Sequence, residues 1–473
     1  MARRTLLLVS PPVLHGQRWW KDQFGNKPHL SSLTGYVRDI ADTRILELDL
    51  EAGADLAPLL ANLDDALTDD VGLLGISCWT SLQYLGTLAV CERVRHLAPH
   101  VPIVVGGHHA TGLPSDFDHR ICDWVVTGDG EEVLRRLCAT WPARPKKMTV
   151  LAGGIFDQSN PDHIDWRRYG HAGAKDRAVW VGTSRGCAFR CRFCVEPERG
   201  AAYSGYSVEA QLDILERLVS THEPEVIAFS DPLFGANRRW LEAFLDGLEA
   251  RALPVLYWAE TRIDLMSAEL LERFHRCRFM LDFGLDSGSE TMVRLMAKAA
   301  NPTRYLHVAH ENLARANAIG LNHGVYVIFN FPGETPDTVQ ETMAFLEGVG
   351  EKGGPMTGSV SCGTFFILPG THAYLRMAEN RRRYGTIIRN PSWWRQAEDH
   401  YDLATDVLPS SAWVGREHEL RDFVDWNGRL NAQWCSRHSI QTQEFRRDFY
   451  AGRRRPRSGE ASAVGNFSLQ PSS

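Results

Sequence analysis

The sequence lacks a long hydrophobic run and an excess of positive charge, and we expect no signal peptide at its start; each of these features would define a class of protein. Nowhere do eighteen apolar residues follow one another, so no membrane-spanning segment and no membrane partner are expected. The first apolar run, residues 5–9, precedes Ser-Pro-Pro and predicts a buried strand rather than a signal peptide. A formal net charge of −6 disfavours a nucleic-acid partner. We therefore expect a cytoplasmic protein whose 473 residues form about three domains.

Ten cysteines are present, and a reducing cytoplasm disfavours disulfides as their purpose. Most of the scattered ones have apolar neighbours, as expected of cysteines that fill space in a core. Seven belong to this scattered group: Cys78, Cys91, Cys122, Cys138, Cys277, Cys362 and Cys435.

The other three cysteines form the cluster Cys187-x3-Cys191-x2-Cys194. A loop this short can turn three thiolates toward one point, and thiolates are soft ligands that select zinc or iron–sulfur clusters. A closed structural zinc site needs four ligands, whereas three cysteines on a [4Fe–4S] cluster leave one iron open. The alternatives are chance clustering and a zinc site completed by a distant residue. His171 lies upstream, but no second C-x2-C pair exists.

After residue 178, short apolar runs alternate with amphipathic stretches, which predicts βαβ units and a parallel sheet. Ligands of such sheets lie at the carboxyl ends of the strands. The expected strands are 179–182, 225–230, 256–262, 278–284 and 324–330. At or after their ends stand Cys187, Asp231, Glu260, Arg262, Asp286, Ser287 and Glu334.

The first 140 residues show a second α/β pattern, with glycines at strand ends that let a large ligand approach the backbone. Helical stretches such as 85–97 separate the strands, which suits a doubly wound sheet. The expected strands are 6–9, 44–50, 71–77, 101–107 and 124–128.

The cysteine loop, with Phe193 before its last cysteine, resembles the cluster motif of radical S-adenosylmethionine (SAM) enzymes. The resemblance implies a [4Fe–4S] cluster on Cys187, Cys191 and Cys194. It also implies SAM chelated to the open iron and cleaved to a 5′-deoxyadenosyl radical. Four later segments are similar to the family's SAM-binding strands in the same order: 229–237, 258–262, 283–288 and 327–335. Carried over by position, the cofactor-binding residues are Phe193, Ser230, Asp231, Glu260, Arg262, Asp286, Ser287, Phe329 and Pro332. Asp286 stands where the family usually has glutamate.

Three segments of the first 140 residues resemble cobalamin-binding domains that precede radical SAM barrels: 75–80, 105–111 and 123–132. The resemblance implies cobalamin contacts from Ser77, Thr80, Gly106, Gly107, His108 and Gly128. Many cobalamin domains ligate cobalt through Asp-x-His-x-x-Gly after the first strand. The corresponding region here holds His15 without that spacing, so we expect cobalamin without a histidine lower ligand.

The expected fold is therefore α/β. A doubly wound, Rossmann-like cobalamin-binding domain (1–140) and a linker (141–178) precede a radical SAM partial (β/α)6 barrel of TIM type (179–372). The segment 364–371 is expected to form the last barrel strand and its turn. A small, mostly helical C-terminal region (373–452) and a disordered tail (453–473) follow. The aromatics of the C-terminal region either line a substrate pocket or pack a cap on the barrel: Trp393, Trp394, Tyr401, Trp413, Trp426 and Trp434.

The resemblance implies a cobalamin-dependent radical SAM methyltransferase that acts on an unactivated carbon of a small molecule, such as a natural-product intermediate. It also implies an external one-electron reductant of the flavodoxin or ferredoxin type. Tyr203, Tyr206 and Glu260 are candidates to line the site. One alternative is a cyclisation, ring contraction or oxidation with the same cofactors and no net methylation. The other is a non-catalytic protein that binds cobalamin or zinc.

Overall fold

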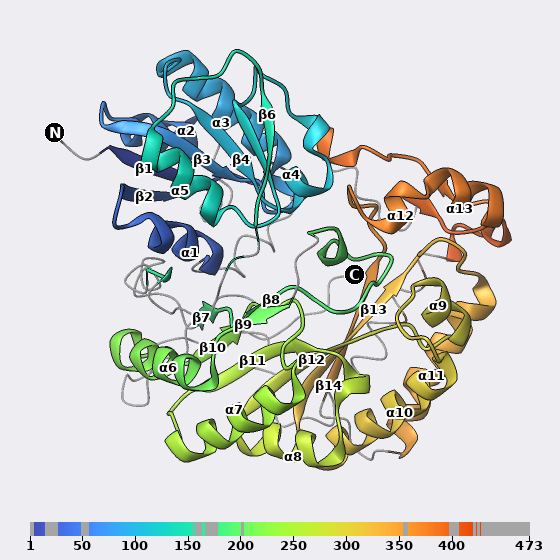
Figure 1. Ribbon diagram of the computed structural model, residues 1–473. Coiled ribbons are helices and arrows are strands. Elements are labelled where there is room, and N and C mark those ends of the chain that lie inside the picture. The colour runs from blue at the N-terminus through green and yellow to red at the C-terminus, as the bar shows by residue number, and fades with distance from the viewer. Residues whose placement is uncertain are drawn as a thin grey trace, which may run out of the picture.

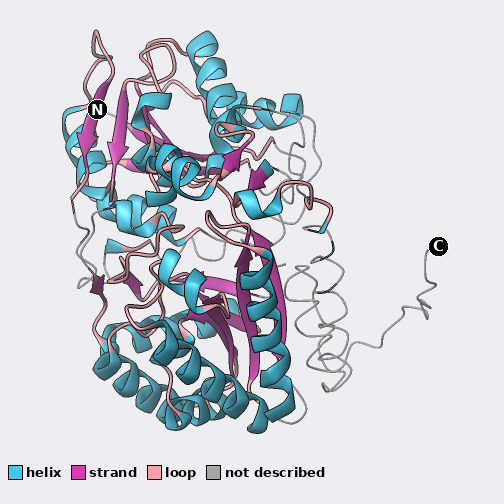
Figure 2. Cartoon of the chain, turned by 90° about the vertical axis from the view of Figure 1, so that its right-hand side faces the viewer, coloured by secondary structure: helices cyan, strands magenta, loops and turns pink. Residues whose placement is uncertain are grey.

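The computed structural model describes residues 4–14, 27–48, 56–154, 156, 163–165, 178–199, 203–352, 358–396, 406–419, 422 and 426. His15, Tyr401, Trp434, Cys435 and the tail expected at 453–473 lie outside the described residues. The described residues contain two six-stranded parallel sheets with helices packed on them, one sheet in each half of the molecule (Figures 1 and 2).

The first sheet holds six parallel strands in the order β2-β1-β3-β4-β5-β6. A strand order that reverses at β1 and β3 is that of a doubly wound sheet, whose ligands lie beyond the carboxyl ends of its strands. The strands are β1 Thr5–Ser10, β2 Asp42–Glu47, β3 Val71–Ser77, β4 Ile103–Gly106, β5 Trp124–Thr127 and β6 Thr149–Ala152.

Helices cover both faces of this sheet, as the alternation of apolar residues along the strands requires. The helices α1 (Pro28–Val37) and α5 (Glu131–Thr140) contribute to a core with Leu6, Leu8 and Leu73. On the other face α2 (Leu56–Ala66) and α3 (Tyr84–Leu97) share a core with Leu7 and Val9. The short helix α4 (His108–Gly112) follows β4 directly.

The second sheet holds six parallel strands in sequence order, from β7 to β14. The strands are β7 Ala178–Val181, β10 Val226–Phe229, β11 Leu256–Thr261, β12 Phe279–Asp286, β13 Asn322–Phe329 and β14 Gly358–Thr364. The helices between them are α6 Val208–His222, α7 Arg238–Arg251, α8 Ala268–Arg276, α9 Glu290–Leu295, α10 Pro302–Ala318 and α11 Pro336–Lys352.

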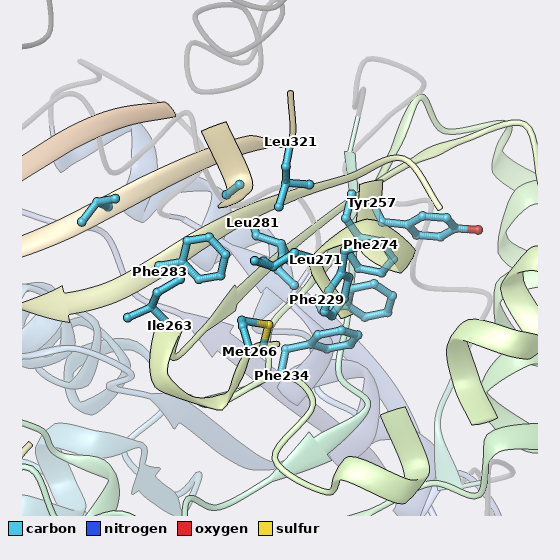
Figure 3. Close-up of a cluster of buried hydrophobic side chains, with 14 of the residues drawn as sticks. Phe229, Phe234, Tyr257, Ile263, Met266, Leu271, Phe274, Leu281, Phe283 and Leu321 are labelled. Atoms are coloured by element: carbon cyan, nitrogen blue, oxygen red, sulfur yellow. The ribbon is translucent and has the colours of Figure 1, made fainter. Parts of the chain in front are cut away.

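The larger helices pack on one side of the second sheet, as in an open barrel (Figure 1). Alternate strand residues such as Phe229, Tyr257 and Phe283 belong to this helix-facing core (Figure 3). The residues between them point to the other, concave side, where Trp180 and Trp258 meet edge to face at 5.1 Å between ring centroids. The concave side therefore holds the side chains available to a ligand.

Two strands differ from the sequence-based expectation. The segment 364–371 was expected to be the last barrel strand, but β14 ends at Thr364 and the following residues form no strand. β14 reads Gly-Ser-Val-Ser-Cys-Gly-Thr, and its small polar residues hide the usual apolar pattern. The segment expected to be a linker contains β6, which pairs with β5 and completes the first sheet.

The C-terminal region contributes the short helices α12 (His372–Leu375) and α13 (Met377–Tyr384) and the antiparallel pair β15 (Ile387–Ile388) and β16 (Val407–Leu408). Trp393 and Trp394 lie in the same hydrophobic cluster as residues of the first sheet. Trp413 and Trp426 are buried in the barrel core. All four are packed inside, which agrees with a cap rather than with a pocket lined by their rings. Within the described residues, no helix is long and apolar enough to cross a membrane.

Candidate functional site

The three clustered cysteines lie on the connection between β7 and α6, beside the two-stranded pair β8 (Ser184–Arg185) and β9 (Ser204–Gly205). Their thiols are free and only partly buried. Burial raises the pKa of the Cys191 thiol, and raises that of Cys194 to about 12, so a bound metal would have to lower both pKa values. In the part of the chain that the structure describes, no three His, Cys, Asp or Glu side chains are arranged as a preformed metal site.

Asp231 holds the segment that leads into this loop. Its carboxylate accepts hydrogen bonds from the backbone N–H of Thr183 at 3.0 Å, the hydroxyl of Thr183 at 2.6 Å and the hydroxyl of Ser184. Burial raises the pKa of Asp231, whereas these donors lower it. Asp231, which we expect to contact SAM, makes these hydrogen bonds to Thr183 and Ser184 of its own chain. Its neighbour Ser230 is the exposed one of the two.

Arg262 reaches the cysteine loop from the end of β11. Its guanidinium lies 3.8 Å from the centroid of the Phe189 ring, and Nη1 lies 3.9 Å from the sulfur of Cys191. Asp264 holds the guanidinium by two hydrogen bonds of 2.9 and 3.0 Å. Arg262, which we expect to face SAM, thus lies against the cysteine loop and places a positive charge beside the Cys191 thiol.

A buried ion pair stands at the end of β12, where Lys298 Nζ lies 2.6 Å from Oδ2 of Asp286. The backbone of Asp286 has φ +65°, a conformation that non-glycine residues rarely adopt, and this conformation sets the direction of its side chain. Arg262, which lies beside Cys191, donates a 2.8 Å hydrogen bond to the backbone carbonyl of Lys298, so the pair is close to the cysteine loop. Sequence reasoning missed Lys298, because a single lysine twelve residues after Asp286 carries no motif of its own.

On the concave side of the barrel, Glu260 and Asp282 occupy paired positions on β11 and β12. Asp282 accepts hydrogen bonds from Trp258 Nε1 at 2.8 Å and from the hydroxyl of Tyr326 at 3.0 Å. The side chain of Glu260 is exposed on this side of the sheet. Partial loss of hydration among the surrounding strands and the charge of Asp282 raise its pKa to about 7. Glu260 is therefore a carboxyl group that titrates near neutral pH.

Several residues carried over by resemblance are engaged elsewhere. The hydroxyl of Ser287 lies 3.0 Å from that of Thr342, on α11. The side chain of Phe329 belongs to the helix-facing core, not the concave side, because β13 alternates in that register. Tyr206 is buried in the same core, whereas Tyr203 is exposed. Pro332 is buried in the turn after β13.

A pocket opens on the α1 and α5 face of the first sheet, at the carboxyl ends of β3, β4 and β5. Gly75, Gly106 and Gly128 are among its lining residues, beside the side chains of Leu8, Val104 and Val126. Gly107 has φ +107°, and a Cβ there would lie 2.4 Å from the carbonyl oxygen of Cys78, so only glycine fits. The glycines thus leave room for a ligand on the sheet itself.

Five residues expected to contact cobalamin line this one pocket: Ser77, Gly106, Gly107, His108 and Gly128. The sixth, Thr80, caps the turn 81–83, since its side chain accepts a hydrogen bond from Leu82 N at 2.9 Å. His29 also lines the pocket and was not predicted from the sequence. Its Nε2 lies 3.1 Å from Oγ of Ser77, and its ring stacks on Trp79 at 4.5 Å.

Two contacts join this pocket to the cysteine loop. Arg185, two residues before Cys187, lines the pocket and pairs with Glu131 at 2.7 Å. His108, also in the pocket, has Nε2 at 3.5 Å from the carboxylate of Glu196, two residues after Cys194. The pocket of the first domain and the cysteine loop of the second are therefore in contact and form one site.

Two family models match the chain over these regions. Residues 29–138 match the B12 binding domain, and residues 181–346 match the Radical SAM superfamily. The chain therefore holds a B12-binding domain followed by a radical SAM domain. The cofactors of these two domain families are those expected from the sequence: a [4Fe–4S] cluster, SAM and cobalamin.

Similar proteins extend the comparison. An uncharacterized methyltransferase, PH0819 of Pyrococcus horikoshii, is 23% identical over 72% of this chain and 77% of its own length. The anaerobic magnesium-protoporphyrin IX monomethyl ester cyclase of Cereibacter sphaeroides is 25% identical over 54% of this chain, which spans 45% of that protein. The radical SAM methyltransferase TsrM of Kitasatospora setae, solved with cobalamin and a [4Fe–4S] cluster, has the same fold. It shows a TM-score of 0.62 at 18% identity over 80% of this chain and 75% of its own.

The residues present suit these cofactors. The three thiols are free and share one short loop, which is the donor set that an iron–sulfur cluster requires. In the pocket, Glu131 is buried, and its Oε2 has no hydrogen-bond partner among the described residues. This oxygen is therefore available to a hydrogen-bond donor on a bound group.

Proposed function

We propose that this protein is a cobalamin-dependent radical SAM methyltransferase that methylates an unactivated carbon of a small molecule, such as a natural-product intermediate. The observation that carries the proposal is the shared position of Arg185. It lines the pocket of the B12-binding domain and stands two residues before the first cysteine of the cluster motif. A methyl carrier and a radical source must both reach one substrate atom, and this adjacency provides the short distance.

In this proposal Cys187, Cys191 and Cys194 hold the cluster, and the pocket with Gly106 and His108 holds cobalamin. When bound, the cluster and SAM supply a hydrogen-abstracting radical, and cobalamin supplies the methyl group. Arg262, with Nη1 3.9 Å from the sulfur of Cys191, sets a positive charge beside the cluster.

Glu260 is the chain's own group for proton transfer. Its pKa of about 7 lets the carboxyl group accept or release a proton near physiological pH. Asp282 opposite it is held by Trp258 and Tyr326 and keeps a fixed orientation. The lumen around Glu260 is where we place the substrate, and an external flavodoxin- or ferredoxin-type protein supplies the electron.

The proposal can be tested before the substrate is known. The anaerobically reconstituted protein is incubated with hydroxocobalamin, SAM and dithionite, and the small-molecule products are identified by liquid chromatography with mass spectrometry. We expect S-adenosylhomocysteine together with methylcobalamin, and 5′-deoxyadenosine as the product of SAM cleavage. The triple variant Cys187→Ala/Cys191→Ala/Cys194→Ala should form no deoxyadenosine.

A second candidate is cyclisation, ring contraction or oxidation without methyl transfer, and the similarity to the magnesium-protoporphyrin ester cyclase favours it. Deoxyadenosine without S-adenosylhomocysteine would support this candidate against methylation. Once a substrate is found, a product heavier by one methylene group decides for methylation. A protein that binds cobalamin or zinc but holds no iron and cleaves no SAM would contradict both enzymatic functions.

A further inference from the structure

Arg185 is a partly buried cation whose backbone belongs to β8 and whose guanidinium contacts residues of the B12-binding domain. Its Nη2 donates to Oε1 of Glu131 at 2.7 Å and to the hydroxyl of Ser32 at 2.7 Å. Its Nη1 lies 3.4 Å from Asp129, and its guanidinium lies 4.5 Å from the centroid of the Phe156 ring. Burial opposes the charge, but the carboxylates of Glu131 and Asp129 raise the pKa of Arg185 above its usual value.

Arg185 stands two residues before Cys187, so these contacts act at the start of the cysteine loop. Gly186, with φ +79°, and Cys187 follow it, so the side chain of Arg185 fixes where the cysteine loop begins. Glu131 is the first residue of α5 and lines the pocket. One of its oxygens is bound by Arg185 and Ser32, and the other has no hydrogen-bond partner among the described residues. A single carboxylate therefore faces the loop and the pocket at the same time.

We propose that the Arg185–Glu131 pair couples corrinoid binding in the pocket to the order of the cysteine loop, so that each cofactor strengthens the binding of the other. A donor on the corrinoid periphery that binds Oε2 of Glu131 fixes the carboxylate. The fixed carboxylate holds Arg185 and thus the start of the loop. By thermodynamic reciprocity, a loop held by its cluster keeps Glu131 in place for the corrinoid. Arg185 and Glu131 act here as positioning residues. The inference rests on the proposed function, which places the two cofactors in these sites.

The test measures the affinity for hydroxocobalamin by visible absorption in two forms of the protein: anaerobically reconstituted with iron and sulfide, and iron-free. We expect the cluster to tighten binding at least about fivefold in the wild type, the lower end of usual allosteric couplings. In Arg185→Met this ratio should fall to one while the iron content stays unchanged. The matched control is Arg93→Met, whose partner Asp64 lies in the same domain but away from the pocket, and it should keep the wild-type ratio.

Wild-type protein with equal affinity in both forms, or Arg185→Met with the wild-type ratio, would overturn the inference. If Arg185→Met does not fold, Ser32→Ala replaces it, because this variant removes one contact of Arg185 and keeps both carboxylates. Its ratio should lie between one and the wild-type value, and an unchanged ratio would count against the coupling. Absence of any hydroxocobalamin binding would instead contradict the proposed function, whereas binding with a ratio of one contradicts only the coupling.

Discussion

The indole N–H of Trp394 donates a 2.7 Å hydrogen bond to Oδ2 of Asp116, a residue 278 positions earlier in the chain. Arg395 Nη2 binds the other carboxylate oxygen at 2.5 Å, and His109 Nε2 lies 3.2 Å from Oδ2. Burial lowers the pKa of His109, whereas Asp116 raises it, and the net shift is downward. One carboxylate of the B12-binding domain therefore fastens the C-terminal cap.

Replacing Asp116 with alanine should loosen the cap, because the donors on Trp394 and Arg395 lose their acceptor. We expect a loss of about 3 kcal/mol of stability, together with faster proteolysis near residue 394. Thermal unfolding and limited proteolysis measure the two effects. Asp118→Ala is the control, since it removes an exposed ion pair with Arg120 and a hydrogen bond from the Arg120 backbone, and it should cost about 1 kcal/mol. Equal effects of the two variants would show that Asp116 does not fasten the cap.

Single alanine variants of Cys187, Cys191 and Cys194 should each lose most of the iron and sulfide that the wild type binds, about four of each. The reason is that each thiolate holds a different iron of the cluster. Iron and sulfide assays after anaerobic reconstitution measure this. Cys362→Ala, another partly buried cysteine, is the control and should keep the full content. A cluster that survives the loss of Cys191 would contradict the assignment.

Lys298→Met should destabilise the protein by about 3–5 kcal/mol, because it leaves the buried Asp286 without its cation. Asp286→Asn tolerates the positive φ and removes the charge, so the double variant should be more stable than Lys298→Met alone. Thermal unfolding of the two single variants and the double variant measures the coupling. The exposed pair Arg238 and Glu242 is the control and should couple by less than about 1 kcal/mol. Additive effects at Asp286 and Lys298 would contradict their pairing.

Gly106→Val should weaken the binding of hydroxocobalamin and leave the fold intact. A Cβ at this position would lie 3.8 Å from the nearest atom, so the backbone tolerates it, but the larger side chain fills the pocket floor. We expect the affinity to fall at least about tenfold, a free-energy change of about 1.4 kcal/mol. Visible titration measures it, and Gly348→Val, on helix α11, is the control. Unchanged affinity in a folded Gly106→Val protein would place the corrinoid elsewhere.

Glu334 should make the stability depend on pH. Burial raises its pKa to about 8, whereas the hydrogen bond from Asn330 N lowers it. Above pH 4.5 the unfolded chain loses this proton while the folded protein keeps it, so stability falls as pH rises and levels off above about 8. Glu334→Gln should remove that fall, and each kcal/mol regained raises the midpoint of thermal unfolding by roughly 2–4 °C. Parallel pH profiles of the two proteins would contradict this assignment.

Much of the fold could be predicted because parallel strands are apolar and the helices between them are amphipathic. The strand β14 escaped prediction, since its small polar residues carry no period, and β6 was hidden in a polar segment. Site residues were harder to predict. Asp231 stands at a strand end, as expected, but its bonds to Thr183 and Ser184 appear only once the chain is folded.

Three cysteines at a spacing that one short loop can bring together, and glycines at the ends of strands, are local features, so the chemistry that the chain can hold follows from the amino-acid sequence alone. Which side chains share a site depends on the folded chain. Arg185 and Glu131 are 54 residues apart, and Trp394 and Asp116 are farther apart still. Local patterns cannot report such pairs, because their energy depends on burial and charge contributed by distant elements. The contact between the corrinoid pocket and the cysteine loop belongs to this second class.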